Sequence, residues 1–229
     1  MKLSSPQKEA KFVQRLNRFA ALVDMGGETA KVHVANSGRL SELLQRGCRV
    51  HLVDRPSLTR QTAYDLCLVD VGHTLVSADA RLPNPLTVEA ISQGQMPQFL
   101  GFSSLKREVR YGESRLDLQL LYPDVTCYLE CKSVTLVVGG AGLFPDAPTS
   151  RGRRHLETLM RARREGHRAA VIFVIQREDA ESFKPNDAAD PSFGQTLRRA
   201  AAEGVEVYAY RCRVRTDEIC ISERLPVHL

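Results

Sequence analysis

The chain lacks any long hydrophobic run. Its longest apolar stretches, such as residues 169–175, are far shorter than the roughly 20 residues that a membrane-spanning helix needs. The first residues also lack the apolar segment of a secretory signal peptide. We therefore expect a soluble, cytoplasmic protein without a membrane partner.

The sequence also lacks closely spaced cysteine pairs, internal repeats and low-complexity segments. Its six cysteines include no C-x-x-C, and the closest pair, Cys127 and Cys131, fits the inward face of one strand. A structural zinc site needs about four ligands at tighter spacing. We expect reduced, buried thiols, no structural zinc and no small-molecule cofactor.

The chain has 229 residues, of which 43% are hydrophobic, and this is enough for one large domain or two small ones. Its net charge of +5 is modest, but residues 151–168 hold seven arginines against two acids. Such a cluster is typical of a nucleic-acid contact, although a solvated helix face explains it equally well.

The N-terminal third is rich in turn signals between short apolar stretches, which indicates small β-structure. Strands are expected at 19–23, 30–34, 50–53, 64–69 and 74–76, with one short helix at 40–45. This is the size of an OB-type barrel, a module that often binds single strands or DNA ends.

Two prolines within residues 81–85 interrupt regular structure and mark the best boundary. We divide the chain into an OB-like barrel, residues 1–82, and an α/β (α+β) domain, residues 83–229. A helix capped by Thr87 is expected to follow and to end near Gly94.

The second domain alternates strands and helices. We expect strands at 116–121, 125–131, 169–176 and 205–214, and helices at 151–165 and 193–203 that stop at Gly166 and Gly204. The continuous apolar run at 169–175 predicts a strand buried on both faces, and therefore a mixed sheet with helices on either side.

Three polar residues stand out in the first two of these strands. Alternation places Asp117 on the face opposite Leu116, Leu118 and Leu120, and it places Glu130 and Lys132 together on one face of the next strand. A turn at residues 122–125 would pair residues whose numbers sum to 247, which sets Asp117 opposite Glu130.

Two adjacent carboxylates repel each other, so a divalent cation is a natural partner. We expect Mg²⁺, or Mn²⁺, held by Asp117, Glu130 and the main-chain carbonyl of Cys131, with Lys132 beside the attacking water or the phosphorane. These are the parts that phosphodiester hydrolysis requires. The alternative is a simple cross-strand ion pair between Asp117 and Lys132.

An outer carboxylate is a further candidate for this metal. Glu89 on the preceding helix is the first choice, and Glu108 and Glu113 compete for the role. A lone glutamate at such a position is also typical of an ordinary solvated surface.

Three blocks make the chain recognisable: GFSSLKREVRYGESRLD at 101–117, YLECKSVTL at 128–136 and FPDAPTSRGRRHL at 144–156. They resemble the sugar fermentation stimulation protein A family, and the resemblance covers the whole chain. The family implies an OB-like domain followed by a PD-(D/E)xK nuclease-like domain, in which Asp117 matches the first acid and Glu130 and Lys132 match the E-x-K pair. Leu116 replaces the proline of the superfamily name.

Arginines at the start of the helix at 151–165 are the candidates for DNA contact, since backbone amides and the helix dipole already favour phosphate there. Thr149 or Ser150 is expected to cap this helix, leaving Arg151, Arg154 and His155 available, although a histidine held in a polar network is equally plausible. Arg39, in the turn that begins at Asn36, is a fourth candidate.

Three functions are compatible with these residues. The first is a metal-dependent deoxyribonuclease. The second is a DNA-binding regulator of sugar (maltose) metabolism genes that performs no chemistry, which the family's name favours. The third is an enzyme that acts on RNA, because neither a barrel nor arginines distinguish the two sugars. We prefer DNA because the family is described as DNA-binding.

Overall fold

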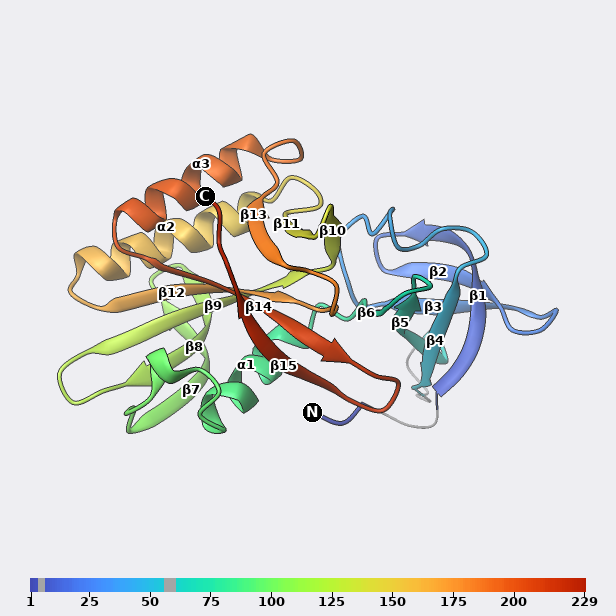
Figure 1. The fold of residues 1–229 in the computed structure, drawn as a ribbon, viewed down its shortest axis with the longest axis horizontal. Helices are drawn as coiled ribbons and strands as arrows, with labels where there is room; N and C mark the ends of the chain where they lie inside the picture. The colour runs from blue at the N-terminus through green and yellow to red at the C-terminus, as the bar shows by residue number, and fades with distance from the viewer. Residues whose placement is uncertain (4–6, 56–60) are drawn as a thin grey trace.

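The computed structural model describes residues 1–3, 7–55 and 61–229. Figure 1 shows two parts side by side, a barrel of strands (blue to cyan) and a larger sheet with helices on both of its faces (green to red). Within the described ranges no helix has the length and apolar character needed to cross a membrane.

The N-terminal part is the barrel that the turn signals indicate. Its strands are β1 (Gln7–Asn17), β2 (Ala20–Asp24), β3 (Thr29–Val34), β4 (Arg49–Asp54), β5 (Tyr64–Asp70) and β6 (Leu75–Ser77). They are ordered β3-β2-β1-β4-β5-β6, and a parallel pairing of β3 with β5, His33 to Asp65 and Val34 to Leu66, closes the ring of the first five. The OB-like barrel is therefore confirmed.

The short helix expected at 40–45 is wrong. Leu44 N donates to Leu40 O (2.9 Å), but a single turn forms and no helix follows. Leu40 has a positive φ of 51°, which a right-handed helix does not accommodate, and both Leu40 and Leu43 are buried in the barrel core. A segment this short lacks the hydrogen bonds that offset helix nucleation.

The second part is built around a mixed sheet with the order β15-β14-β12-β9-β8-β7, in which β9, β12 and β14 run parallel and the remaining pairs are antiparallel. Figure 1 shows α1 on one face, with α2 and α3 on the other. The expected mixed sheet between helices is confirmed. The elements are α1 (Pro83–Ser92), a 3-10 helix η1 (Pro97–Phe99), β7 (Ser104–Tyr111), β8 (Ser114–Leu121), β9 (Thr126–Val134), β10 (Leu136–Val138), β11 (Ala141–Phe144), α2 (Ser150–Arg164), β12 (Arg168–Ile175), β13 (Ser182–Pro185), α3 (Pro191–Ala202), β14 (Glu206–Val214) and β15 (Ile219–Leu225).

The proline-rich stretch was expected to interrupt regular structure, but it does not. Pro83 and Pro85 lie in the first turn of α1, where the amide that proline lacks has no partner within a helix. Thr87 is consequently not the N-cap. It is buried inside α1, and its Oγ1 lies 3.5 Å from the Cys131 thiol.

Local signals elsewhere are confirmed. Pairs between β8 and β9 run from Leu118 with Leu129 to Leu121 with Thr126, which is the register expected from the turn, but the ladder ends before Asp117 and Glu130, which do not pair as expected. The Thr149 hydroxyl caps α2 by accepting from Gly152 N (3.0 Å). Gly166 and Gly204 have positive φ directly after the C-caps of α2 and α3, a conformation in which glycine is not strained.

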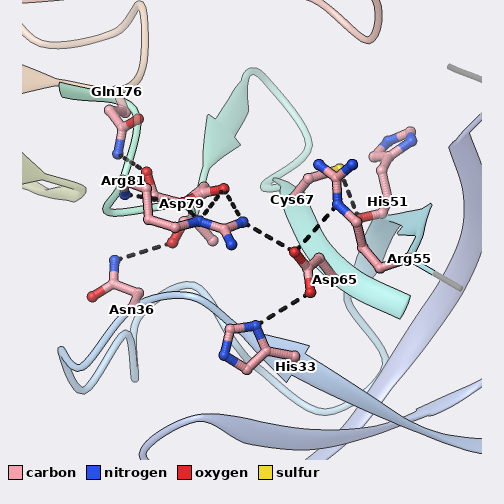
Figure 2. A network of polar contacts seen from close by, with 10 residues as sticks. His33, Asn36, His51, Arg55, Asp65, Cys67, Asp79, Arg81 and Gln176 are labelled. Carbon is pink, nitrogen blue, oxygen red and sulfur yellow. Dashed lines mark hydrogen bonds and ion pairs between the residues drawn. The ribbon is translucent and has the colours of Figure 1, made fainter. Parts of the chain in front are cut away.

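A polar network joins the two parts (Figure 2). The Arg81 guanidinium donates to Asp65 Oδ2 (3.0 Å) and to Asp79 Oδ2 (2.6 Å). Gln176, directly after β12, donates to the main-chain oxygen of Asp79 (3.1 Å), and Asn36 donates to the main-chain oxygen of Ala78 (3.1 Å). The end of β12 is thus attached to the segment that follows β6, the last strand of the barrel part. This contact positions the barrel beside the carboxylates of the second part that are described next.

Candidate active site

Asp117 lies at the point in β8 where the apolar side chains change from one face of the sheet to the other. Leu118 and Leu120 pack in the core under α1, whereas Leu116 packs in the core under α2. The expectation that these three leucines share one face is therefore wrong. Because β8 and β9 no longer pair beyond Leu118, the Asp117 carboxylate reaches β9 and accepts from Cys131 N (2.7 Å).

Asn84 is a second contact of Asp117 that sequence reasoning missed. It lies in the first turn of α1 between the two prolines, and its Nδ2 is 3.4 Å from Asp117 Oδ1. The other amide atom, Oδ1, is buried and meets no hydrogen-bond partner in the described part of the chain. A polar residue between two prolines at a helix start was the available signal.

Glu130 is buried on the face of β9 that α2 covers, with 3% of the residue exposed. Its Oε1 accepts from Lys132 Nζ (2.6 Å) and forms a hydrogen bond with His155 Nδ1. Its Oε2 is buried and has no hydrogen-bond partner among the residues that the structure describes. The ion pair expected as the alternative, Asp117 with Lys132, does not form, because Lys132 pairs with Glu130.

The two carboxyl groups have pKa values shifted in opposite directions. Burial and the nearby Glu130 charge raise the pKa of Asp117 to about 6. Burial also acts to raise the pKa of Glu130, but the Lys132 ammonium and the His155 ring outweigh it and lower that pKa. Around pH 6 the pair therefore carries an ionised Glu130 and an Asp117 that readily exchanges a proton.

His155 faces the carboxylate rather than solvent. It is 5% exposed, its Nδ1 lies 3.5 Å from Lys132 Nζ, and Arg151 Nε is 3.4 Å from its other ring nitrogen. These contacts place His155 in the polar network that was the alternative, and its contact with DNA stays a prediction. Its position suits holding Glu130 and Lys132 in place.

A cleft of about 650 Å³ opens between the barrel and the sheet at these residues. Asp117, Glu130 and Lys132 all line it, so the structure brings the three predicted residues together. The barrel contributes the turn that begins at Asn36, together with Arg18 and Phe19, which the sequence did not indicate. On the other side, Arg151 and the residues that cap α2 complete the lining.

Three other predicted residues lie apart from this cleft. Arg39 and Arg154 are exposed and do not line it. Glu89 pairs with the amino group of Met1 (2.8 Å) rather than facing the carboxylates. Of the two competitors for its role, Glu108 pairs with Arg115 (3.1 Å), and Glu113 is exposed.

The donor set for a cation is small. Within residues 1–3, 7–55 and 61–229 no group of three or more histidine, cysteine, aspartate or glutamate side chains is arranged to hold a metal. Asp117 and Glu130 would need main-chain or amide oxygens beside them. The unpartnered buried oxygens of Glu130 and Asn84 fit this need, because a hard cation prefers oxygen ligands.

Fold and site together define a class of protein in which an OB barrel is joined to a mixed-sheet α+β domain, with paired carboxylates and a lysine at the junction. Residues 13–78 match the family model described as SfsA N-terminal OB domain, and residues 81–218 match the one described as Sugar fermentation stimulation protein RE domain. The chain belongs to the sugar fermentation stimulation protein family.

Similar proteins cover the full length of the chain. The sugar fermentation stimulation protein homolog of Caldanaerobacter subterraneus subsp. tengcongensis is 44% identical over all of both chains. The homolog of Moorella thermoacetica is 48% identical over 96% of this chain and 94% of the relative. A structure of Pyrococcus furiosus SfsA in complex with Ca²⁺ aligns over all of both chains with a TM-score of 0.92 and 30% identity.

Proposed function

We propose that this chain is a divalent-metal-dependent nuclease that binds DNA in the cleft between the barrel and the sheet. The observation that carries the proposal is the placement of Asp117, Glu130 and Lys132 around one cleft, with a buried Glu130 oxygen that has no partner within residues 1–3, 7–55 and 61–229. A protein that only bound DNA would gain nothing from two acids facing a phosphate chain.

The nature of the cation follows from the ligand chemistry. Asp117, Glu130 and the main-chain carbonyl of Cys131 would hold Mg²⁺ or Mn²⁺, and Asn84 Oδ1 is a further oxygen nearby. The Pyrococcus furiosus relative was solved in complex with Ca²⁺, a cation with the same preference for oxygen, which is compatible with the proposed metal dependence. When bound, Mg²⁺ would lower the pKa of a water and stabilise charge on the scissile phosphate.

The residues of this chain would each supply one part of the reaction. Lys132 provides a positive charge beside Glu130 that favours the attacking water or the charged phosphorane. His155 holds Glu130 in place from behind. Arg151, at the start of α2, and Arg18, on the barrel, line opposite sides of the cleft and suit the phosphates on either side of the cut.

The deciding experiment incubates the purified chain with linear, branched and single-stranded DNA in Mg²⁺ or Mn²⁺. We expect cleavage by the parent, and a loss of at least about 100-fold in Asp117→Ala and in Lys132→Ala. Glu113→Ala, which removes an exposed acid of the neighbouring hairpin, is the matched control and should cleave at the parent rate.

Binding without cleavage under every metal would overturn the nuclease and favour the DNA-binding regulator. Cleavage that survives in Asp117→Ala would place the chemistry elsewhere. Faster cleavage of RNA than of DNA would identify RNA, not DNA, as the substrate.

A further inference from the structure

Phe19 is an exposed aromatic side chain at the edge of the candidate site. It lies in the turn between β1 and β2 and is 49% exposed, outside the core cluster of the barrel. It lines the cleft that contains Asp117, and it also lines a second hollow of about 490 Å³ on the barrel. Phe19 therefore borders two hollows, and packing of the barrel core does not explain the position of its exposed side chain.

The backbone around Phe19 is held firmly. The Arg15 guanidinium donates to the main-chain oxygens of Asn17 (3.1 Å) and Asn36 (2.8 Å), which ties this turn to the neighbouring one. Phe19 O accepts from Val34 N (2.9 Å). A ring presented on a fixed backbone loses little conformational freedom when it binds a ligand.

The second hollow continues from Phe19 along a basic surface. It is lined by Lys31, His33 and Arg81. The His33 ring stacks on Phe19 with a centroid distance of 6.5 Å and an interplanar angle of 22°. Figure 2 shows His33 bonded to Asp65, and this contact between His33 Nδ1 and Asp65 Oδ1 (3.2 Å) fixes the imidazole.

Two unpaired cations lie on either side of the ring. Arg18 lines the cleft and Lys31 lines the second hollow, and in the described part of the chain neither takes part in an ion pair. An exposed ring between free cations is the arrangement that binds a single strand, because bases stack on the ring while phosphates meet the charges. Bases within a duplex have both faces covered and cannot use such a ring.

We propose that an unpaired DNA strand leaves the cleft across Phe19 and continues into the hollow lined by Lys31 and His33. The substrate class is then DNA with a single-stranded segment beside the cleavage site, such as a tailed or splayed duplex. The claim about which DNA is cleaved rests on the proposed function, whereas the single-strand binding site is tested without any cleavage.

The test uses the absence of tryptophan from this chain. Phe19→Trp introduces a single fluorophore at the proposed stacking position. In metal-free buffer, a short oligothymidylate and a duplex with a single-stranded tail should quench its fluorescence saturably, and a blunt duplex should not. Full cleavage activity with no quenching by either ligand would overturn the inference and leave the nuclease intact.

The affinity of the same DNA ligands gives the matched comparison. Phe19→Ala should weaken binding of the oligothymidylate about 10-fold or more, since one stacked base accounts for that range, and should leave blunt-duplex affinity unchanged. Leu16→Ala removes another exposed apolar side chain of the same hairpin, 43% exposed, that lines neither hollow. It should leave both affinities unchanged.

Two kinds of result in these binding assays would overturn the proposed binding of a DNA strand across Phe19. Equal losses in Phe19→Ala and Leu16→Ala, or equal losses for single strand and duplex, would assign Phe19 a merely structural role. An RNA strand bound at least about 10-fold more tightly than the DNA strand would overturn the DNA assignment. If single strands quench the introduced tryptophan but no DNA is cut, the proposed single-strand binding site stands and the proposed nuclease function is wrong.

Discussion

At the scale of single residues, Asp117 and Glu130 hold opposite protonation preferences within one site. The charge of Glu130 is compensated by Lys132 and His155, whereas within the described residues the donors to Asp117 are the Cys131 and Asn84 amides. These donors compensate only part of the burial of Asp117 and of its repulsion by Glu130, so the pKa of Asp117 is raised to about 6. Because the two acids repel each other in the metal-free site, binding of a cation there should stabilise the folded protein.

This repulsion predicts that Asp117→Asn stabilises the metal-free protein. The folded chain keeps a proton on Asp117 up to about pH 6, while the unfolded chain releases it near the ordinary value of 3.8. The folded state therefore binds more protons between these values, so stability falls as pH rises through this window and stays low above it. At pH 7.5 we expect the variant to gain about 2–3 kcal/mol in urea unfolding, and almost nothing near pH 3.5.

A divalent cation is the control for this prediction. Mg²⁺ or Mn²⁺ should raise the melting temperature of the parent and not that of Asp117→Asn, because binding to the folded state alone stabilises it. A variant that is less stable than the parent at pH 7.5 without metal would contradict the shifted pKa.

At the scale of secondary-structure elements, Asp190 links the starts of two helices. Its buried carboxylate caps α3 by accepting from Phe193 N (3.0 Å) and accepts from Thr149 N (2.8 Å), the cap residue of α2. It also pairs with Arg153 (3.0 Å). The start of α2 lines the cleft, so this carboxylate sets one wall of the site.

We expect Asp190→Ala to cost roughly 3 kcal/mol in urea unfolding, because it removes a helix cap and leaves Arg153 and two amides without their acceptor. Asp187→Ala breaks the exposed pair with Arg198 and should change stability by less than about 1 kcal/mol. Similar losses in the two variants would mean that the shared acceptor has no special role.

The start of α2 also separates two of the predicted DNA contacts. Arg151 and Arg154 are both exposed near the helix start, but only Arg151 lines the cleft. Arg151→Ala should weaken DNA binding and reduce the slope of log affinity against log salt by about 1, while Arg154→Ala should leave the slope unchanged. The reverse order, measured by anisotropy across a salt series, would place DNA on the outer face of α2.

At the scale of the whole molecule, the cleft is lined by residues of both parts and therefore depends on how the two parts are attached. Gln176 is fully buried at this junction and donates to Asp79 O (3.1 Å) and Ser133 Oγ (2.9 Å), while its own main-chain oxygen accepts from Ser77 N (3.0 Å). One residue thus connects the end of β12 to the chain that leaves the barrel.

Gln176→Leu should therefore uncouple the two parts. We expect a loss of about 1–3 kcal/mol and a broader urea transition with a smaller m-value, because buried acceptors lose their donor and the parts unfold less cooperatively. Gln119→Leu removes an amide that bonds Tyr128 within the second part (3.2 Å) and should keep the transition sharp. A sharp transition in both variants would show that Gln176 does not couple the two parts.

Features governed by neighbours in sequence were predictable. The cap at Thr149, the helix stops at Gly166 and Gly204, and the register of the hairpin that carries Asp117 and Glu130 all follow from a few consecutive residues. The same is true of the arrangement of polar and apolar positions in β9. These contacts are short in sequence, so turn chemistry, capping and side-chain periodicity suffice to specify them.

Other features were decided only by distant segments meeting in space. The reversal of faces at Asp117 requires β8 to separate from β9, Asn84 reaches the site from α1, and Phe19 reaches it from the barrel. Glu89 shows the converse. Its place in the sequence made it a candidate metal ligand, but the packing of α1 sets its carboxylate against the amino group of Met1. The amino-acid sequence by itself determined the elements and the chemical groups available. Tertiary packing decided which groups share a cavity, since burial and long-range contacts depend on the whole fold.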